Sequence, residues 1–177
     1  MKRYIPLVLA ILLFVIVHEG THAVVASMFN EFASFQVKYY GFEVHFKTPV
    51  PDRSGIKWGF ISGMSNIITL TIGYLLFIYR KNVANYKSAF FRTFGYWVTF
   101  FFLLFDPLNL SIMPFIFGGD IGGIVEGFRI NKYLVQFIFF MVLLINRELI
   151  IHQLFPLYGV KSRHPLFRPL LRDRLEN

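Results

Sequence analysis

The chain has 177 residues, of which 55% are hydrophobic and 23 are phenylalanine, and its mean hydropathy is +0.55. Several runs approach the roughly 20 apolar residues that cross a bilayer, so the composition indicates a membrane protein. The net charge of +8 is then expected in loops and tails, and it does not indicate a nucleic-acid partner. The chain contains no cysteine, which excludes disulfides, a thiol nucleophile and cysteine-ligated metal.

The first apolar run extends from Tyr4 to Met28 and is about long enough to span a bilayer as one helix. It contains His18-Glu19-Gly20-Thr21-His22. On a helix the two histidines lie one turn apart on one face, so both rings can bind one zinc ion. Glu19 can reach a water molecule on that metal, as in zinc hydrolases. Because ionisable side chains are unfavourable within an apolar span, this pattern predicts a function, against the alternative of a structural polar cluster.

The same run also has features of a cleavable signal peptide. It begins with Lys2-Arg3 and contains the small-residue stretch Val24-Val25-Ala26. We expect the run to remain in the protein as a membrane span, because the rest of the chain carries features that match the histidine motif.

Residues 35–47 predict a β-hairpin. Apolar residues alternate with polar ones on both sides of Tyr40-Gly41, namely Phe35, Val37 and Tyr39, then Phe42, Val44 and Phe46. This aromatic face is too apolar for a free loop, so we expect the hairpin to lie on the membrane or to dip into it. The hairpin is then either an ordinary interfacial element or an edge strand that captures an extended substrate by backbone pairing.

The second predicted span, Trp58 to Tyr79, contains Ser62-Gly63-Met64-Ser65-Asn66. Small residues allow close contact between helices. The amide of Asn66 needs partners, which can be another helix or a substrate strand. A short basic connection, residues 80–92, follows.

The third apolar segment begins at Phe90 and is interrupted by Asp106-Pro107-Leu108-Asn109, with Gly118-Gly119-Asp120 further on. Irregular backbone at membrane depth is tolerated only where protein or a wet cavity covers it. We therefore expect a third metal ligand in this broken span. The glycines at 122, 123 and 127 are expected to keep the backbone of the following stretch pliable.

The fourth predicted span runs from Tyr133 to Ile151, and Glu148 and His152 at its end are expected to form an interfacial pair and not a metal site. A basic tail, residues 156–177, is expected to lie on anionic lipid through Lys161, Arg163, Arg168, Arg172 and Arg174. The predicted fold is therefore an all-α membrane protein with about four transmembrane helices, one broken span and a membrane-associated β-hairpin between the first two.

Residues 10–125 resemble the site-2 protease family of intramembrane zinc metalloproteases, which cut transmembrane segments of other proteins. The His18–His22 motif lies in the first span, as in that family. Gly63-Met64-Ser65-Asn66 is similar to the family's Gly-Pro-x-x-Asn element, with Met64 in place of proline. The family's third signature is an Asn, then prolines, then Leu-Asp-Gly, and Asn109, Pro114 and Asp120 occur in that order with a stretched spacing.

The resemblance implies that Asp120 is the last zinc ligand. Zn²⁺ with neutral His18 and His22, Asp120 and an ionised Glu19 sums to zero formal charge, which a low-dielectric site holds most easily. Asp106 satisfies the same sum and stays open as an alternative, although an aspartate before Pro107 also suits a helix-ending turn.

The function that this resemblance implies is an intramembrane zinc endopeptidase over residues 1–155, multi-pass in the cell membrane. Glu19 is expected as the general base, and Asn66 and Asn109 as contacts to a transmembrane protein substrate. Two other classes stay open: a zinc-binding but inactive relative that binds membrane proteins, and a small channel or transporter subunit whose polar residues line a path. The orientation in the membrane also stays open, because the positive-inside rule and the resemblance favour opposite insertions.

Overall fold

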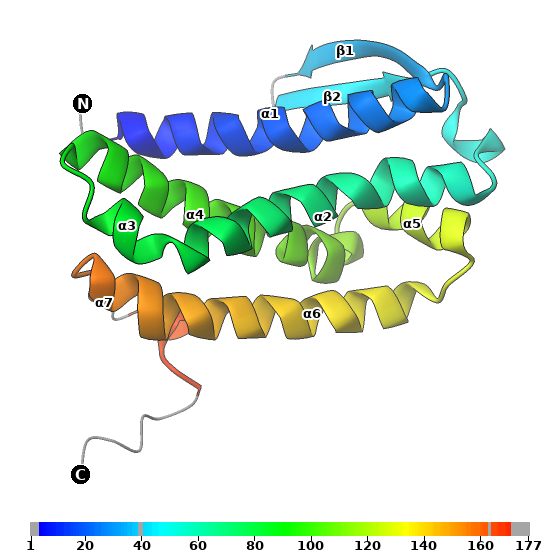
Figure 1. Ribbon diagram of the computed structural model, residues 1–177. Helices are drawn as coiled ribbons and strands as arrows, with labels where there is room; N and C mark the ends of the chain where they lie inside the picture. The colour runs from blue at the N-terminus through cyan, green and yellow to red at the C-terminus, as the bar shows by residue number, and fades with distance from the viewer. Residues whose placement is uncertain (1–3, 39–40, 163, 171–177) are drawn as a thin grey trace.

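The computed structural model describes residues 4–38, 41–162 and 164–170. Four long helices run alongside one another: α1 (Ile5–Met28), α2 (Ile56–Ile78), α4 (Ala89–Ser111) and α6 (Lys132–Leu149) (Figure 1). The segments that contain them, residues 5–28, 56–78, 89–115 and 132–157, are long and apolar enough to cross a membrane. The prediction of an all-α membrane fold with four spans is confirmed.

Shorter elements connect and extend the four helices. They are β1 (Phe32–Lys38), β2 (Gly41–Phe46), α3 (Arg80–Ala84), α5 (Asp120–Phe128), a π-helical turn at Ile150–Leu154 and α7 (Phe155–Leu157). Turns of 3₁₀ helix occur at Val50–Asp52, Met113–Phe115 and Pro165–Phe167. Several predicted features lie outside the described residues: the basic start at Lys2-Arg3, Tyr39 and Tyr40 in the hairpin turn, and Arg163, Arg172 and Arg174 in the tail.

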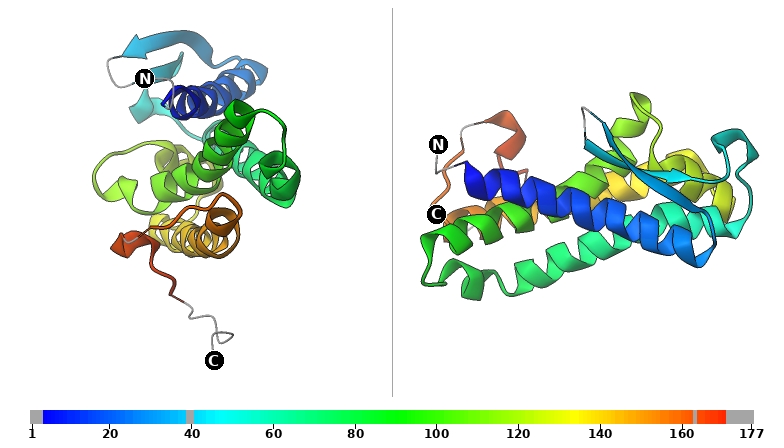
Figure 2. Two further views of the ribbon diagram at one scale, coloured as in Figure 1. Left: turned by 90° about the vertical axis from the view of Figure 1, so that its left-hand side faces the viewer. Right: turned by 90° about the horizontal axis from the view of Figure 1, so that it is seen from above.

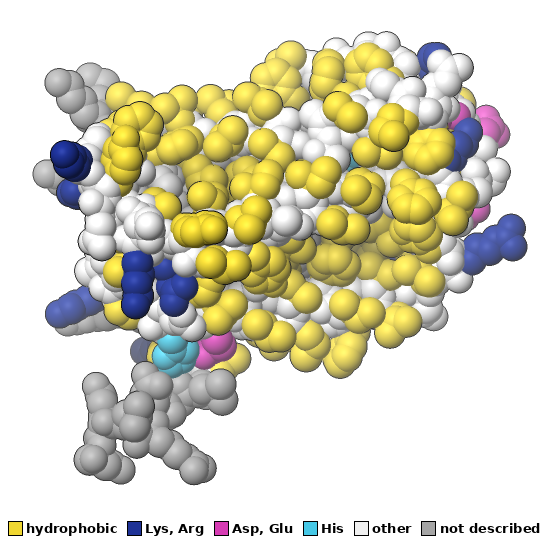
Figure 3. Space-filling view, viewed as in Figure 1, with side chains coloured by type: hydrophobic (Ala, Val, Ile, Leu, Met, Phe, Trp, Pro, Cys, Tyr) yellow, Lys and Arg dark blue, Asp and Glu magenta, His cyan; other side chains and the backbone are white. Residues whose placement is uncertain are grey.

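The helix α4 lies at the centre of the bundle, where it contacts α1, α2 and α6. An end-on view shows α1 and the hairpin on one side, α2 and α4 in the middle, and α6 on the other side (Figure 2). On the face shown in Figure 3, hydrophobic side chains cover the middle, and Lys and Arg side chains lie towards the two ends. An apolar band between charged ends is the surface that a bilayer requires.

The predicted hairpin is present. Strands β1 and β2 pair antiparallel, with Phe35 opposite Val44 and Val37 opposite Phe42. The sheet lies along the C-terminal half of α1 (Figure 1). Val44 is buried beneath it, whereas Phe35, Val37 and Phe42 stay exposed on a molecule whose helices also expose apolar side chains. This exposure agrees with a hairpin that lies in the membrane region.

The break in the third span comes later than predicted, because α4 continues through Asp106 and Pro107 and ends at Ser111. Proline has no backbone N–H, so the carbonyl four residues earlier, that of Leu103, loses its helical partner. The side chain of Asn146 in α6 replaces it, with Nδ2 donating to Leu103 O at 2.7 Å. Tyr74 OH of α2 in turn donates to Asn146 Oδ1 at 2.7 Å. The irregular stretch follows at residues 112–119.

Two of the three glycines of α5, Gly123 and Gly127, serve close packing against α2, which is a different role from the expected pliability, whereas a Cβ on Gly122 would meet open space. A Cβ on Gly127 would collide with the backbone of Gly59, and one on Gly123 with the side chain of Ser62. Small residues at such positions let two helices approach closely. This contact holds the first residue of α5, Asp120, against α2.

Candidate metal centre

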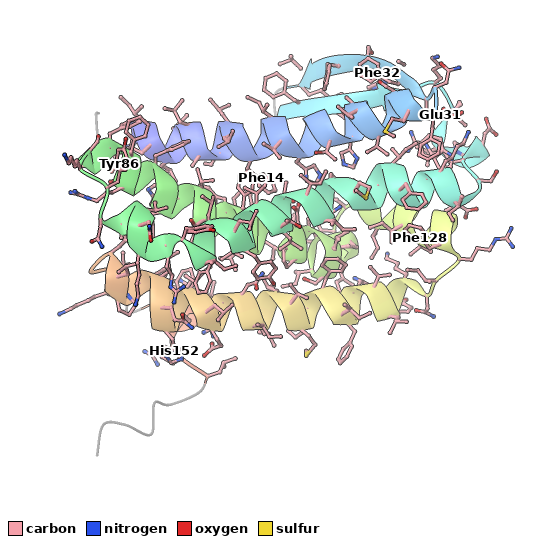
Figure 4. The ribbon with its side chains drawn as sticks, viewed as in Figure 1. Phe14, Glu31, Phe32, Tyr86, Phe128 and His152 are labelled. Carbon is pink, nitrogen blue, oxygen red and sulfur yellow. The ribbon has the colours of Figure 1, made fainter. Side chains whose placement is uncertain are left out.

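The structure brings His18 and His22 of α1 together with Asp120 of α5. One ligand atom from each residue lies within 4.8 Å of the other two. Both histidines are buried, and Phe14 stacks on His18 from one turn earlier in α1, with ring centroids 5.6 Å apart. Phe14 points from α1 into the bundle (Figure 4). The i, i+4 spacing therefore places both rings on the inward face of α1, as the sequence predicted.

The distances among these ligand atoms suit a single cation. The Nε2 atoms of His18 and His22 lie 3.2 Å apart. Asp120 Oδ2 lies 3.1 Å from His18 Nε2, and Asp120 Oδ1 lies 3.1 Å from His22 Nε2. Ligand atoms about 2.0–2.1 Å from a tetrahedral zinc ion lie roughly 3.3 Å from one another. The donor set of two imidazoles and one carboxylate fits such an ion.

The tautomer of His22 also favours a cation between this residue and Asp120. Its Nδ1 lies 2.6 Å from the carbonyl oxygen of Ile61, which can only accept, so Nδ1 carries the proton. Nε2 then carries a lone pair and faces the Asp120 carboxylate. Two acceptors at this distance repel one another unless a cation or a proton lies between them. Ser65 Oγ, at 3.1 Å, and His18 Nε2, at 3.2 Å, are further polar neighbours of His22 Nε2.

Asn66 and Asn109, predicted to contact a substrate, both lie against Asp120. Asn66 Nδ2 donates to Asp120 Oδ2 at 3.1 Å, and Asn109 Nδ2 donates to the same oxygen at 3.4 Å. Asn66 is fully buried and also donates to Ser62 O at 2.9 Å. In this arrangement the two amides orient a candidate ligand. Their contact with a substrate stays a prediction.

Asp106, the alternative third ligand, lies on the other side of His18. Its Oδ1 is 3.0 Å from His18 Nδ1, and Thr69 Oγ1 donates to its Oδ2. The geometry therefore favours Asp120 as the third ligand, because it is Asp120 that meets both Nε2 atoms.

Glu19 lies at a cavity of about 940 Å³ next to the cluster. The cavity is lined by His18, Glu19, His22, Ser62, Asn109, Asp120, the loop glycines 118 and 119, and residues 43–46 of β2. Glu19 Oε2 accepts a hydrogen bond from the backbone N–H of Val44 in β2 at 3.2 Å. The strand β2 therefore forms one wall of the space into which the candidate metal site opens.

Glu31, which the sequence analysis did not single out, connects the hairpin to the helices through hydrogen bonds. Its carboxylate accepts from Lys57 Nζ at 2.5 Å, from Thr48 Oγ1 at 2.8 Å and from Thr48 N at 3.2 Å. The hydrogen bond from Lys57, followed by those from Thr48, lowers the pKa of Glu31 below its usual value. Glu31 and Phe32 lie together at the end of α1 where the hairpin begins (Figure 4). In the sequence, the signal for this role is an acidic residue directly before the apolar strand that begins at Phe32.

The predicted interfacial pair, Glu148 and His152, lies outside the cluster of His18, His22 and Asp120. Glu148 Oε2 is 3.3 Å from His152 Nε2, as expected for an i, i+4 pair at the end of a span. Part of the tail packs on the bundle, where Phe167 contacts Phe100 and Phe155. Arg147 Nε donates to the Leu166 carbonyl at 2.5 Å. The predicted contact of the tail with anionic lipid stays a prediction.

No family model, curated protein or solved structure matches this chain.

Proposed function

We propose that this chain is an intramembrane zinc-dependent endopeptidase, which hydrolyses a peptide bond within or near a transmembrane segment of another protein. The observation that carries the proposal is the convergence of His18 Nε2, His22 Nε2 and the Asp120 carboxylate at 3.1–3.2 Å, beside Glu19 and a cavity. Buried carboxylates and imidazoles are unfavourable at membrane depth, so their convergence on one point favours a functional site. The resemblance to site-2 proteases favours the same reaction.

The residues take distinct roles in this proposal. His18, His22 and Asp120 hold the ion, while Asn66 and Asn109 fix the orientation of the Asp120 carboxylate. A zinc ion in such a site lowers the pKa of bound water to about 7 and polarises a carbonyl oxygen. Glu19 accepts the proton of the attacking water and later delivers it to the leaving amine. The Val44 N–H occupies Glu19 Oε2, which leaves Oε1 for this proton transfer.

The substrate has to be extended at the cleavage point, because an α-helix engages its carbonyl groups in its own hydrogen bonds. Strand β2 lines the cavity from Glu43 to Phe46, on the side of the hairpin away from β1. An extended segment can pair with such an edge through backbone hydrogen bonds. We therefore assign β2 the role of holding the substrate across the metal site, in a chain that resides in the cell membrane.

The test uses the full-length protein, purified in detergent. Zinc content is measured first, and cleavage of a model transmembrane peptide is then followed with and without a chelator. The proposal predicts one zinc per chain, cleavage of the peptide, and loss of cleavage with the chelator that added zinc restores. Cleavage that survives complete removal of metal, or a protein that binds no metal, contradicts it. Stoichiometric zinc without cleavage would identify the inactive relative.

A further inference from the structure

We propose that Asp106 is a positioning residue for His18. Its carboxylate accepts the Nδ1–H of His18 and thereby fixes the tautomer and ring orientation in which Nε2 faces the metal. This inference rests on the proposed metal site. It also changes the expected role of Asp106, from an alternative ligand to a partner of a ligand.

The contact is direct and has no competitor. Asp106 Oδ1 lies 3.0 Å from His18 Nδ1. Both atoms are buried, and among the described residues neither has a hydrogen-bond partner elsewhere. The 3.0 Å separation is within hydrogen-bond range, although the N–H is not aligned with the oxygen in this structure. Two buried polar atoms that face only one another are satisfied by this one interaction.

The same contact excludes Asp106 from the metal itself. The two nitrogens of an imidazole ring point in divergent directions, so a residue that caps Nδ1 cannot share the ion held by Nε2. His22 shows the matching arrangement, in which Nδ1 meets the Ile61 carbonyl and Nε2 meets Asp120. Each histidine of the pair thus has an acceptor behind it. Such acceptors orient metal-binding histidines and raise their basicity.

Asp106 lies in the part of α4 where the sequence predicted a break in the helix. The helix continues through Pro107 because Asn146 satisfies the Leu103 carbonyl. Asp106 is 1% exposed, and its second oxygen accepts from Thr69 of α2. A carboxylate so deeply buried is unfavourable unless donors or positive charge compensate it.

The test compares zinc affinity in three variants of the full-length protein, measured by competition with a chromophoric chelator. Asp106→Leu replaces both acceptor oxygens by methyl groups and is expected to weaken zinc binding about 10–100-fold. Asp106→Asn retains an acceptor oxygen without the charge, so we expect an intermediate affinity. Asp52→Asn, at an exposed aspartate outside the site, is the matched control and should bind zinc as the wild type does.

Thermal unfolding of the metal-free proteins separates positioning from a structural role. Removing one member of a buried pair leaves its partners unsatisfied, so metal-free Asp106→Leu should unfold below the wild-type temperature, whereas metal-free Asp106→Asn keeps an acceptor oxygen and should unfold close to it. Zinc affinities within threefold of wild type in both Asp106 variants would overturn the inference. So would a weakened zinc affinity of Asp106→Asn that is accompanied by a lower unfolding temperature of the metal-free variant.

A measurement on the wild type keeps the inference testable if Asp106→Leu does not fold. In the cobalt-loaded protein, each bound imidazole with a hydrogen-bonded Nδ1–H should give a slowly exchanging, strongly shifted proton resonance. We expect two such resonances, one for each histidine. A single resonance would overturn the role of Asp106 while leaving the metal site intact. A wild-type protein that binds neither metal would contradict the proposed function, and this inference with it.

Discussion

Asn146 in α6 donates a hydrogen bond of 2.7 Å to the carbonyl oxygen of Leu103 in α4, the carbonyl that Pro107 leaves without a helical partner. Tyr74 OH donates to the same Asn146 side chain, so one buried amide connects three helices. We expect Asn146→Leu to destabilise the protein by about 1 kcal/mol, the usual range for a hydrogen bond between membrane helices. Chemical denaturation in mixed micelles measures this change.

The control for Asn146 is a double-mutant cycle with Pro107→Ala. Alanine returns a backbone N–H to Leu103 O, so Asn146→Leu should destabilise the Pro107→Ala background less than it does the wild type. Equal effects in both backgrounds would show that Asn146 does not act through this carbonyl.

The Glu31 carboxylate should make the attachment of the hairpin dependent on pH. Its pKa is lowered in the folded protein, first by the hydrogen bond from Lys57 and then by Thr48. A lowered pKa stabilises the folded state fully above the ordinary glutamate value of 4.5, and this stabilisation is lost as the pH falls below it. The protection factors of the backbone amides in residues 32–38 and 41–46, which are corrected for the intrinsic pH dependence of hydrogen exchange, should therefore fall in this acidic range. Glu31→Gln should exchange faster at neutral pH and lack this acid-induced change, and a wild type without it would contradict the assignment.

The span count, the hairpin and the position of the histidine pair could be predicted from sequence, because each rests on a local period. Apolar runs of sufficient length define the four helices, and the alternation of Val37, Phe42 and Val44 defines two strands. The i, i+4 spacing alone places His18 and His22 on one face. None of these three predictions depends on how the helices pack against one another.

The partners of these residues could not be predicted, because they depend on which helices meet. The break at Asp106-Pro107 was misplaced because the donor that rescues the helix, Asn146, comes 40 residues later in another span. Gly123 and Gly127 allow chain flexibility and close packing equally well in sequence, and only the contact with α2 decides between them. Asn146 and Gln136 did carry a signal that was not used, since each is a polar residue within an apolar run.

Zinc binding should require His18 and His22 but not His45 or His152. His18→Ala and His22→Ala each remove a nitrogen from the cluster and should lose stoichiometric zinc. His45 lines the cavity and His152 pairs with Glu148, both outside the cluster. Their alanine variants should keep one zinc per chain by elemental analysis. Loss of zinc in the His45 or His152 variant would show that the ligand set is wrong.

Asp120 and Asn66 should affect metal binding to different extents. Asp120→Asn removes the charged ligand, so both zinc content and cleavage should fall. Asn66→Ala removes only the amide that holds Asp120 Oδ2, and we expect a loss of about 10-fold in zinc affinity. Equilibrium dialysis against zinc measures the zinc binding of both variants. An Asn66 variant that binds zinc normally but has a raised KM for peptide would restore the substrate-binding role predicted from sequence.

Glu19 is proposed to transfer protons and not to bind the metal. It follows His18 by one residue, about 100° around the helix, and its side chain is engaged by Val44 N and not by the ligand cluster. The direct test is Glu19→Gln, assayed for zinc content and for cleavage of the same transmembrane peptide. Glutamine keeps the shape and loses the basicity, so the variant should retain one zinc per chain while cleavage slows by at least about 10²–10⁴-fold. A Glu19→Gln protein that retains zinc and cleaves at the wild-type rate would contradict the account.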